Sequence, residues 1–280
     1  MKKLLYTILI ILIGIFEILL YSRFIGTTGL KTNEITLSTN ISESYDGLKI
    51  IHFSDLHYKK VITEKRVKEL IQTINKNKPD LVLFTGDLLD KDYELQNTDI
   101  NFLIKELSKI ESKYGTYAIL GDQDAQNLET LKNIYIQSNI TLLENNFTII
   151  HNENNDKILI GGISSYLENI ANLDDLITQI PTETISYQII MIHEPDYIPT
   201  ILEKIPNIPM ILSGHSINGS INLPIIKQLL LPTGAKTYYK PYYQINQTNI
   251  YISNGIGVNQ VNFRFLNTPS INFYRLRKSN

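Results

Sequence analysis

Residues that can bind metal ions recur where short apolar runs of this sequence end. Asp55 and His57 follow the apolar run at 50–53, and Asp87 follows Asp80–Phe84. The other positions of this kind are Asp122, His193 and His215. Carboxylates and imidazoles suit Mn, Fe and Zn ions. If the apolar runs are strands of an open α/β sheet, their carboxyl ends meet at one edge, and the pattern predicts a metal site there.

These residues also have a structural interpretation. Asp55-x-His57 alone is compatible with a hydrogen-bonded turn at a strand end. A single histidine is more often a hydrogen-bonded core residue than a ligand, but the shared strand-end position favours a ligand role for three of them. His52 lies inside an apolar run and is expected to be structural, whereas His151 is expected to be an ordinary strand or loop residue. Asp90 is expected to brace its loop by hydrogen bonds.

The composition excludes several kinds of site. The chain has 280 residues, of which 43% are hydrophobic and 19% charged, so it can bury the core of a sizeable globular domain. It contains no cysteine, which excludes disulfides, thiolate catalysis and cysteine-ligated zinc. The net charge of −2 and the scattered basic residues provide no basic stripe, and no nucleic-acid partner is expected.

Apolar runs alternate with helical patterns in the first half of the chain. Helices are predicted over Thr63–Asn77 and Ile100–Lys113, and strands over Asp80–Phe84 and Thr116–Leu120, which indicates an α/β fold with a largely parallel sheet. From Asn139 onward strands dominate, which predicts a second sheet packed on the first. The segments predicted there are strands at Ile140–Glu144, Phe147–His151, Ile158–Ile163, Tyr187–His193, Pro209–Ser213 and Asn249–Asn254, and helices at Asn169–Gln179 and Tyr197–Ile205.

The first residues are apolar enough to anchor the chain in a membrane. Met1–Leu20 is just long enough to span a bilayer, so membrane contact is expected through residues 1–21. No small-residue cleavage site follows, which favours an uncleaved anchor over a cleaved signal peptide or a buried core helix. Basic residues flank the segment on both sides and leave the side of the membrane open. We expect an anchor over residues 1–25, a linker with an edge strand over 26–47, and the main domain over 48–280.

Five ordered motifs resemble those of the calcineurin-like metallophosphoesterases, whose pattern is D-x-H, G-D-x-x-D, G-N-H-[DE], H and G-H-x-H. The matching residues are Asp55-x-His57, Gly86-Asp87, Gly121-Asp122-Gln123-Asp124, His193 and Gly214-His215. The apolar N-terminus, His193-Glu194-Pro195-Asp196 and the tail Tyr251–Phe265 further resemble the membrane-associated YkuE/YaeI-type branch of that family.

The resemblance implies a four-layer α/β/β/α sandwich of two packed mixed sheets with an N-terminal transmembrane helix. It also implies two divalent cations (Mn, Fe or Zn), with a hydroxide held between them for in-line attack on phosphorus. By motif, the first cation would be held by Asp55, His57 and Asp87. Asp87 would bridge to a second cation, also held by Asp122, His193 and His215. The catalytic residues implied are Asp55, His57, Asp87, His193 and His215.

Three positions depart from the family pattern. Asp122 replaces an asparagine and adds a negative charge. Gln123 replaces a histidine and cannot deliver a proton to a leaving group. Ile217 replaces the last histidine and removes a ligand from the first site, so either two cations or only one is expected.

These features favour a metal-dependent phosphoesterase or pyrophosphohydrolase that acts on substrates with good leaving groups. By analogy with the membrane-associated branch, the substrate would be a lipid-linked nucleotide-sugar such as UDP-diacylglucosamine, at a bacterial inner or cytoplasmic membrane. The alternative is a catalytically degenerate module that binds a metal or a phosphate ligand without efficient turnover. A membrane-anchored structural domain without metal is a third interpretation.

Overall fold

Two six-stranded mixed sheets form the centre of the computed structural model, which describes residues 2–181, 184–259 and 261–279. The first sheet has the order β1 (Lys31–Thr39), β12 (Ser270–Lys278), β2 (Leu48–Phe53), β3 (Leu81–Phe84), β4 (Thr116–Ala118) and β5 (Thr141–Leu142). The second has the order β10 (Tyr242–Ile245), β11 (Thr248–Ile252), β9 (Met210–Ser213), β8 (Tyr187–Ile192), β7 (Lys157–Ile163) and β6 (Asn146–His151). The strands that lead into the metal-ligand motifs are parallel to one another within each sheet.

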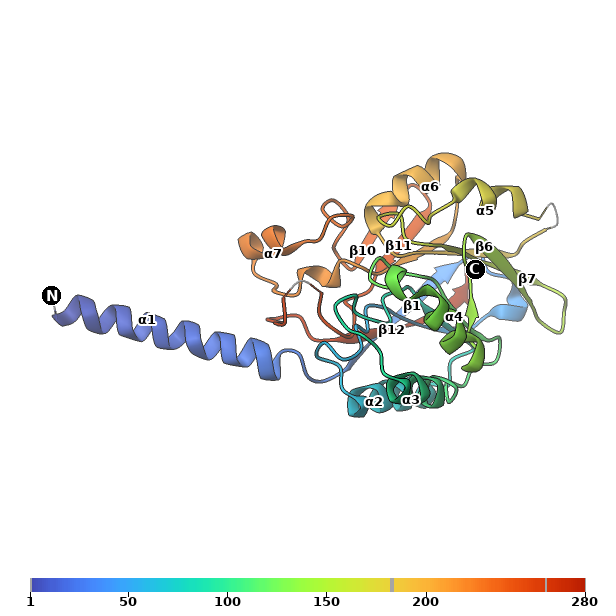
Figure 1. Ribbon diagram of the computed structural model, residues 1–280. Coiled ribbons are helices and arrows are strands. Elements are labelled where there is room, and N and C mark those ends of the chain that lie inside the picture. The colour runs from blue at the N-terminus through green and yellow to red at the C-terminus, as the bar shows by residue number, and fades with distance from the viewer. Residues whose placement is uncertain (1, 182–183, 260, 280) are drawn as a thin grey trace.

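Helices cover the outer face of each sheet and complete a four-layer α/β/β/α sandwich (Figure 1). The first sheet packs on α2 (Glu64–Lys76), α3 (Asn97–Leu107) and α4 (Leu128–Gln137), and the second on α5 (Leu173–Gln179) and α6 (Ile198–Lys204). Successive side chains of a strand point to opposite faces of its sheet. Ile50 of β2 therefore packs between the sheets, while Ile51 packs under the helices. The predicted fold class is confirmed.

The helix predicted over Ile100–Lys113 is shifted in the structure. Helix α3 begins at Asn97, where Asp99 accepts a hydrogen bond from the backbone N–H of Gln96 at 3.2 Å, and it ends at Leu107. Beyond it, Asn75 of α2 donates to the carbonyl of Lys109 at 2.7 Å and accepts from the N–H of Glu111 at 3.0 Å. These bonds satisfy the backbone in a non-helical path, so the helix stops six residues early.

The strand predicted at Ile140–Glu144 belongs to the first sheet and not to the second, and only Thr141–Leu142 pairs, parallel to β4. Helix α4 lies between the two strands in the chain and provides the crossover that parallel neighbours require. The helices and strands that were not predicted include α4, α7 (Pro224–Leu230), β10 and β12. Strand β12 lies between β1 and β2, where it pairs with segments more than 200 residues earlier in the chain.

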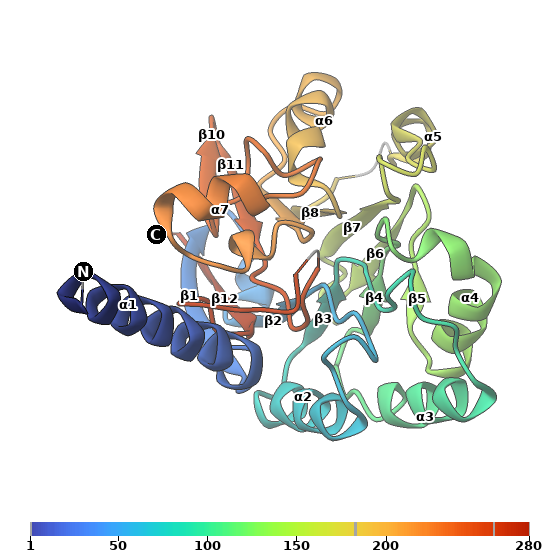
Figure 2. The same cartoon turned by 60° about the vertical axis from the view of Figure 1, so that its left-hand side comes forward.

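One apolar helix projects from the globular part (Figures 1 and 2). Helix α1 (Lys2–Leu20) continues into a π-helical turn, Tyr21–Ile25, and none of the described side chains of α1 is buried. The whole segment Lys2–Ile25 is long and apolar enough to cross a membrane. Its C-terminal end is joined to the domain, because the N–H of Arg264 donates to the carbonyl of Ser22 at 2.9 Å.

Gly26, directly after this helix, permits the close contact with Arg264. It has ordinary helical dihedral angles, but an added Cβ would overlap the carbonyl oxygen of Arg264. We expect Gly26→Ala to lower the free energy of unfolding by about 1–3 kcal/mol, the usual cost of overpacking. The measurement is thermal unfolding of the full-length protein in detergent. Gly14→Ala is the control, because among the described residues nothing lies within 4 Å of the added Cβ. Equal unfolding midpoints for the two variants would contradict the prediction.

Candidate metal centre

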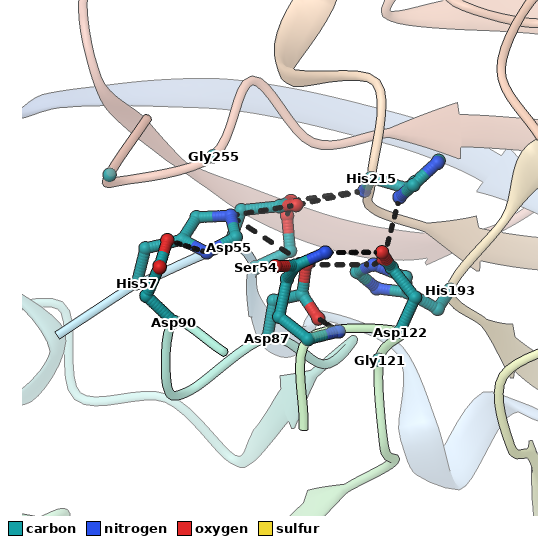
Figure 3. Close-up of polar contacts among 12 residues, drawn as sticks. Ser54, Asp55, His57, Asp87, Asp90, Gly121, Asp122, His193, His215 and Gly255 are labelled. Atoms are coloured by element: carbon teal, nitrogen blue, oxygen red, sulfur yellow. Dashed lines mark hydrogen bonds and ion pairs between the residues drawn. The ribbon is translucent and has the colours of Figure 1, made fainter. Parts of the chain in front are cut away.

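Five strand ends bring the predicted ligands together in one buried cluster (Figure 3). The contributing strands are β2, β3 and β4 of the first sheet and β8 and β9 of the second. The side chains that meet there are Asp55 and His57 after β2, Asp87 after β3, Asp122 after β4, His193 after β8 and His215 after β9. The structure therefore places all six predicted ligand residues side by side.

The cluster consists of two groups that share Asp87. Within each group the ligand atoms lie within 4.8 Å of one another. The Oδ2 atom of Asp87 is 3.6 Å from Nε2 of His57 in one group and 3.2 Å from Nε2 of His193 in the other. A carboxylate in this position can contact two cations at once, as in two-metal phosphatase sites.

The group that contains Asp122 has its two imidazoles fixed by backbone carbonyls. Nδ1 of His193 is 2.6 Å from the carbonyl of Thr85, and Nε2 of His215 is 2.6 Å from that of Thr233. The opposite ring nitrogens lie 3.2 and 3.0 Å from Oδ1 of Asp122. A histidine that donates one ring N–H to a carbonyl presents its other nitrogen as a metal ligand.

In the other group, His57 and Asp55 are both completely buried. Burial lowers the pKa of His57 to about 4, which favours the neutral imidazole that binds metals. Behind the ring, Nδ1 lies 3.6 Å from Oδ2 of Asp90, and this oxygen accepts a 2.7 Å hydrogen bond from Lys60. Both carboxylate oxygens of Asp55 accept the N–H of His215, at 3.1 and 3.0 Å, which connects the two groups.

Several buried ligand atoms lack the partners that buried polar atoms normally have. Among the described residues, Oδ2 of Asp87, both ring nitrogens of His57 and Nδ1 of His215 make no hydrogen bond, although other ligand-type atoms lie 3.0–3.6 Å away. Burial raises the pKa of Asp87 far above its usual value, and the neighbouring charges of Asp122 and Asp124 add to this. Divalent cations would satisfy these atoms and offset the clustered negative charge, so the donor set fits metal binding.

The loops that carry the ligands have a strained backbone. Asp55, His57, Asp87 and His215 all have positive φ angles, of 52°, 45°, 60° and 65°. This region is unfavourable for residues other than glycine, and such strain is concentrated at functional sites. Gly121 allows the loops to approach, because an added Cβ there would overlap the carboxylate of Asp87.

Gln123, one of the departures from the family pattern, and its neighbour Asp124 hold the loops together. Gln123 donates its N–H to Oδ1 of Asp87 at 2.9 Å and its side-chain amide to Asp122. Asp124 accepts the N–H groups of Asp87, Leu89 and Gly121 at 2.9, 3.2 and 3.0 Å. Asp124 thus stabilises the loop backbone. The residue before it is Gln123, so Asp124 does not orient the histidine that the family pattern has at that position.

The other departure is beside the Asp55 group. Ile217 is only 1% exposed, and its side chain meets Gly255, whose position also borders Asp55 and Arg264. An aliphatic side chain therefore occupies the edge of the cluster on the side of Asp55.

Arg264 holds a loop that is bonded to the metal centre, and the sequence motifs did not predict this role. It is fully buried, and its guanidinium donates to the carbonyls of Asn254, Gly255 and Gly257 at 2.8, 3.0 and 2.6 Å. Burial lowers its pKa to about 9, although nearby Asp55 favours the cation. The same loop is bonded to the metal centre, because the N–H of Gly257 donates to the carbonyl of Asp55 at 2.7 Å. The sequence contained the arginine and the glycines but gave no sign that they pair.

The other two histidines lie outside the ligand cluster. His52 is buried in β2, where Nε2 is 2.9 Å from the hydroxyl of Thr85, and burial lowers the pKa of His52 to about 3. His151 is exposed at the end of β6.

The two packed sheets, and the Asp87 carboxylate shared by two groups of potential metal ligands, are typical of metallophosphoesterases. A family model described as calcineurin-like phosphoesterase matches residues 48–218, and the chain belongs to that family. The Bacillus subtilis metallophosphoesterase YkuE is 29% identical over 263 residues, which cover 93% of this chain and 90% of YkuE. A transmembrane protein with a metallophosphoesterase domain from Bos taurus is 25% identical, over 76% of this chain and 49% of that protein.

Among solved structures, the sulfate thiohydrolase SoxB from Thermus thermophilus has a similar fold. Its TM-score is 0.51 at 13% sequence identity, and the match covers 83% of this chain and 57% of SoxB. At this identity the likeness concerns the fold alone. Together, the family membership, the apolar helix and the transmembrane relatives indicate a membrane-associated metallophosphoesterase with candidate sites for divalent metals.

Proposed function

We propose that the chain is a metal-dependent hydrolase of phosphodiester or pyrophosphate bonds. The observation that carries the proposal is the position of Asp87 between two groups of potential ligands. Cations would be held by Asp55, His57 and Asp87 and by Asp87, Asp122, His193 and His215. When bound, they would lower the pKa of a water molecule and neutralise the phosphoryl oxygens. Manganese suits this oxygen and imidazole set, as do iron and zinc.

The residues of the site limit the choice of leaving group. Gln123 occupies the position from which the family's histidine would act, and an amide cannot donate a proton as a general acid. We therefore propose substrates whose leaving group departs as a stable anion, such as an aryl diester or a nucleotide-sugar pyrophosphate. The apolar helix supports a lipid-linked substrate, for which UDP-diacylglucosamine is the specific candidate. We place the anchor at residues 1–25, the catalytic domain at 48–280, and the protein at a bacterial cytoplasmic membrane.

A second candidate function is a binding module with little turnover. It is favoured by Ile217, which is buried beside the Asp55 group and supplies no ligand. In this case a metal in the Asp122 group would bind a phosphate-bearing ligand without efficient hydrolysis.

Substituting Ile217→His is expected to strengthen metal binding in the Asp55 group. An imidazole at this position adds a ligand. We expect the affinity of the Asp55 group for its cation, the more weakly bound of the two, to rise by about tenfold or more. The measurement is manganese content by mass spectrometry after dialysis against buffers of defined free Mn²⁺. Ile136→His, at an exposed position on α4, is the control. An unchanged binding curve for the weaker cation would show that the side chain at 217 does not reach it.

The test of the function compares three substrates with full-length protein in detergent and added Mn²⁺. The substrates are a bis-aryl phosphodiester, a UDP-sugar and a simple alkyl phosphate, each assayed with and without EDTA. We expect EDTA-sensitive turnover of the first two and much slower turnover of the third. Equal rates on all three would contradict the leaving-group argument, and no turnover by folded, metal-loaded protein would favour the binding module.

A further inference from the structure

An apolar cleft of about 260 Å³ separates the membrane helix from two loops of the globular domain. One wall is formed by α1 and the other by the segments Ile221–Leu223 and Phe263–Phe265. The side chains that face it include Ile15, Ile18, Leu19, Leu223, Phe263 and Phe265. Such a surface offers few partners to a polar ligand, and it matches the hydrocarbon part of a lipid.

The depth of the cleft along α1 indicates what fills it. At a rise of 1.5 Å per residue, Ile15 lies about 15 Å from the end of the helical segment at Ile25. That is about half the thickness of the hydrocarbon core of a bilayer. If α1 crosses the membrane, the two loops lie beside it below the membrane surface, where acyl chains are the available occupants.

Several polar groups of the walls are paired internally, which suits a hydrocarbon environment. The hydroxyl of Ser22 donates to the carbonyl of Ile18 at 2.6 Å. The two loops bond to each other: the N–H of Phe265 donates to Ser220 at 3.1 Å, and the N–H of Asn222 donates to Phe265 at 2.9 Å. These backbone groups therefore do not depend on water.

Two further exposed apolar side chains follow the loops of the cleft in the chain. Leu266, next to Phe265, is 62% exposed, and Leu229 of α7 is 76% exposed. In the π-helical turn after α1, the ring of Tyr21 packs edge-on against the ring of Phe265, and the two ring centroids are 6.0 Å apart. Tyrosine is enriched at the membrane interface, and interfacial elements bury apolar side chains about 5–10 Å into the boundary of the acyl region.

We propose that the surface formed by Ile221–Leu223, Phe263–Leu266 and Leu229 of α7 is a second membrane-contacting element. It enters the bilayer beside α1, and acyl chains of membrane lipids fill the cleft. Arg264 connects this surface to the metal centre, because its flanking residues face the lipid while its guanidinium holds the loop bonded to Asp55. The metal centre is thereby held next to the lipid headgroups. This inference does not depend on catalytic activity.

Quenching of tryptophan fluorescence by brominated lipid tests the contact, because the chain has no tryptophan of its own. Single variants Phe263→Trp and Leu266→Trp are prepared in the full-length protein and reconstituted into phosphatidylcholine and phosphatidylglycerol vesicles. Part of the phosphatidylcholine carries bromine on its acyl chains. Phe16→Trp in α1 is the positive control. Ile136→Trp, 76% exposed on α4, is the negative control.

We expect tryptophan at 263 and 266 to lose most of its emission in brominated vesicles, as at position 16, while position 136 keeps its emission. Leu266→Trp changes an exposed side chain, so it remains informative if Phe263→Trp fails to fold. Emission at 266 that is retained as at 136 would overturn the proposal. A second copy of the chain seated on the surface would give that same result. Retained emission at position 16 would also overturn it, because α1 would then not be embedded.

Discussion

Asp87→Asn is expected to reduce metal-dependent phosphodiester hydrolysis by about a thousandfold or more. Asp87 is the one side chain common to both ligand groups, and its Oδ2 atom faces His57 and His193. Asparagine has the same shape and can still accept the hydrogen bond from Gln123. It loses the charge that holds two cations, however, and with it several kcal/mol of transition-state stabilisation, of which about 4 kcal/mol is a thousandfold in rate.

The measurement is the initial rate on a bis-aryl phosphodiester at saturating Mn²⁺. Asp92→Asn is the matched control, because Asp92 is exposed on the segment after the same strand. Thermal unfolding of both variants without added metal shows whether they are folded. Retention of more than about a tenth of the wild-type rate in folded Asp87→Asn would exclude a bridging role for this carboxylate.

The second large effect is expected from Gln123→His, which restores a proton donor at the site. Gln123 is buried beside Asp122, so an imidazole in its place would lie next to the ligand groups. We expect hydrolysis of an alkyl phosphate to rise by about a hundredfold, the lower end of what a positioned acid contributes. The lower end is appropriate because Asp124, which would orient the ring, already accepts three backbone N–H groups.

The diagnostic quantity is the ratio of alkyl-ester to bis-aryl-ester turnover, since a leaving group that departs as a stable anion gains little from an acid. An imidazolium donates only while it is protonated, so the gain should decline as the pH rises above about 6.5. Gln72→His, on the surface helix α2, serves as the control. An unchanged ratio in a folded, metal-binding Gln123→His variant would show that position 123 does not reach the leaving group.

The strand-end motifs were predictable from the sequence because each depends on a short local pattern. Apolar runs followed by Asp55, Asp87 or His193 specify both a buried strand and what lies at its carboxyl end. The helical pattern of Thr63–Asn77 likewise predicted α2, which buries Val67 and Leu70.

What the sequence did not predict depends on contacts between distant segments. Strand β12 pairs with β1 across more than 200 residues, and no local signal indicates that partnership. The early end of α3 depends on Asn75 of a neighbouring helix, and the two-residue β5 is defined by its pairing with β4. Arg264 is a similar case, because its importance lies in carbonyl groups that only the folded loop brings together.

The most direct test of the central claim is a manganese titration of EDTA-stripped, full-length protein, with bound metal and bis-aryl phosphodiester turnover measured on the same samples. The account predicts that turnover is absent without metal, appears as Mn²⁺ binds, and fails to appear in Asp87→Asn at the same free Mn²⁺. Turnover that is independent of bound metal, or equal in wild type and Asp87→Asn, would contradict it.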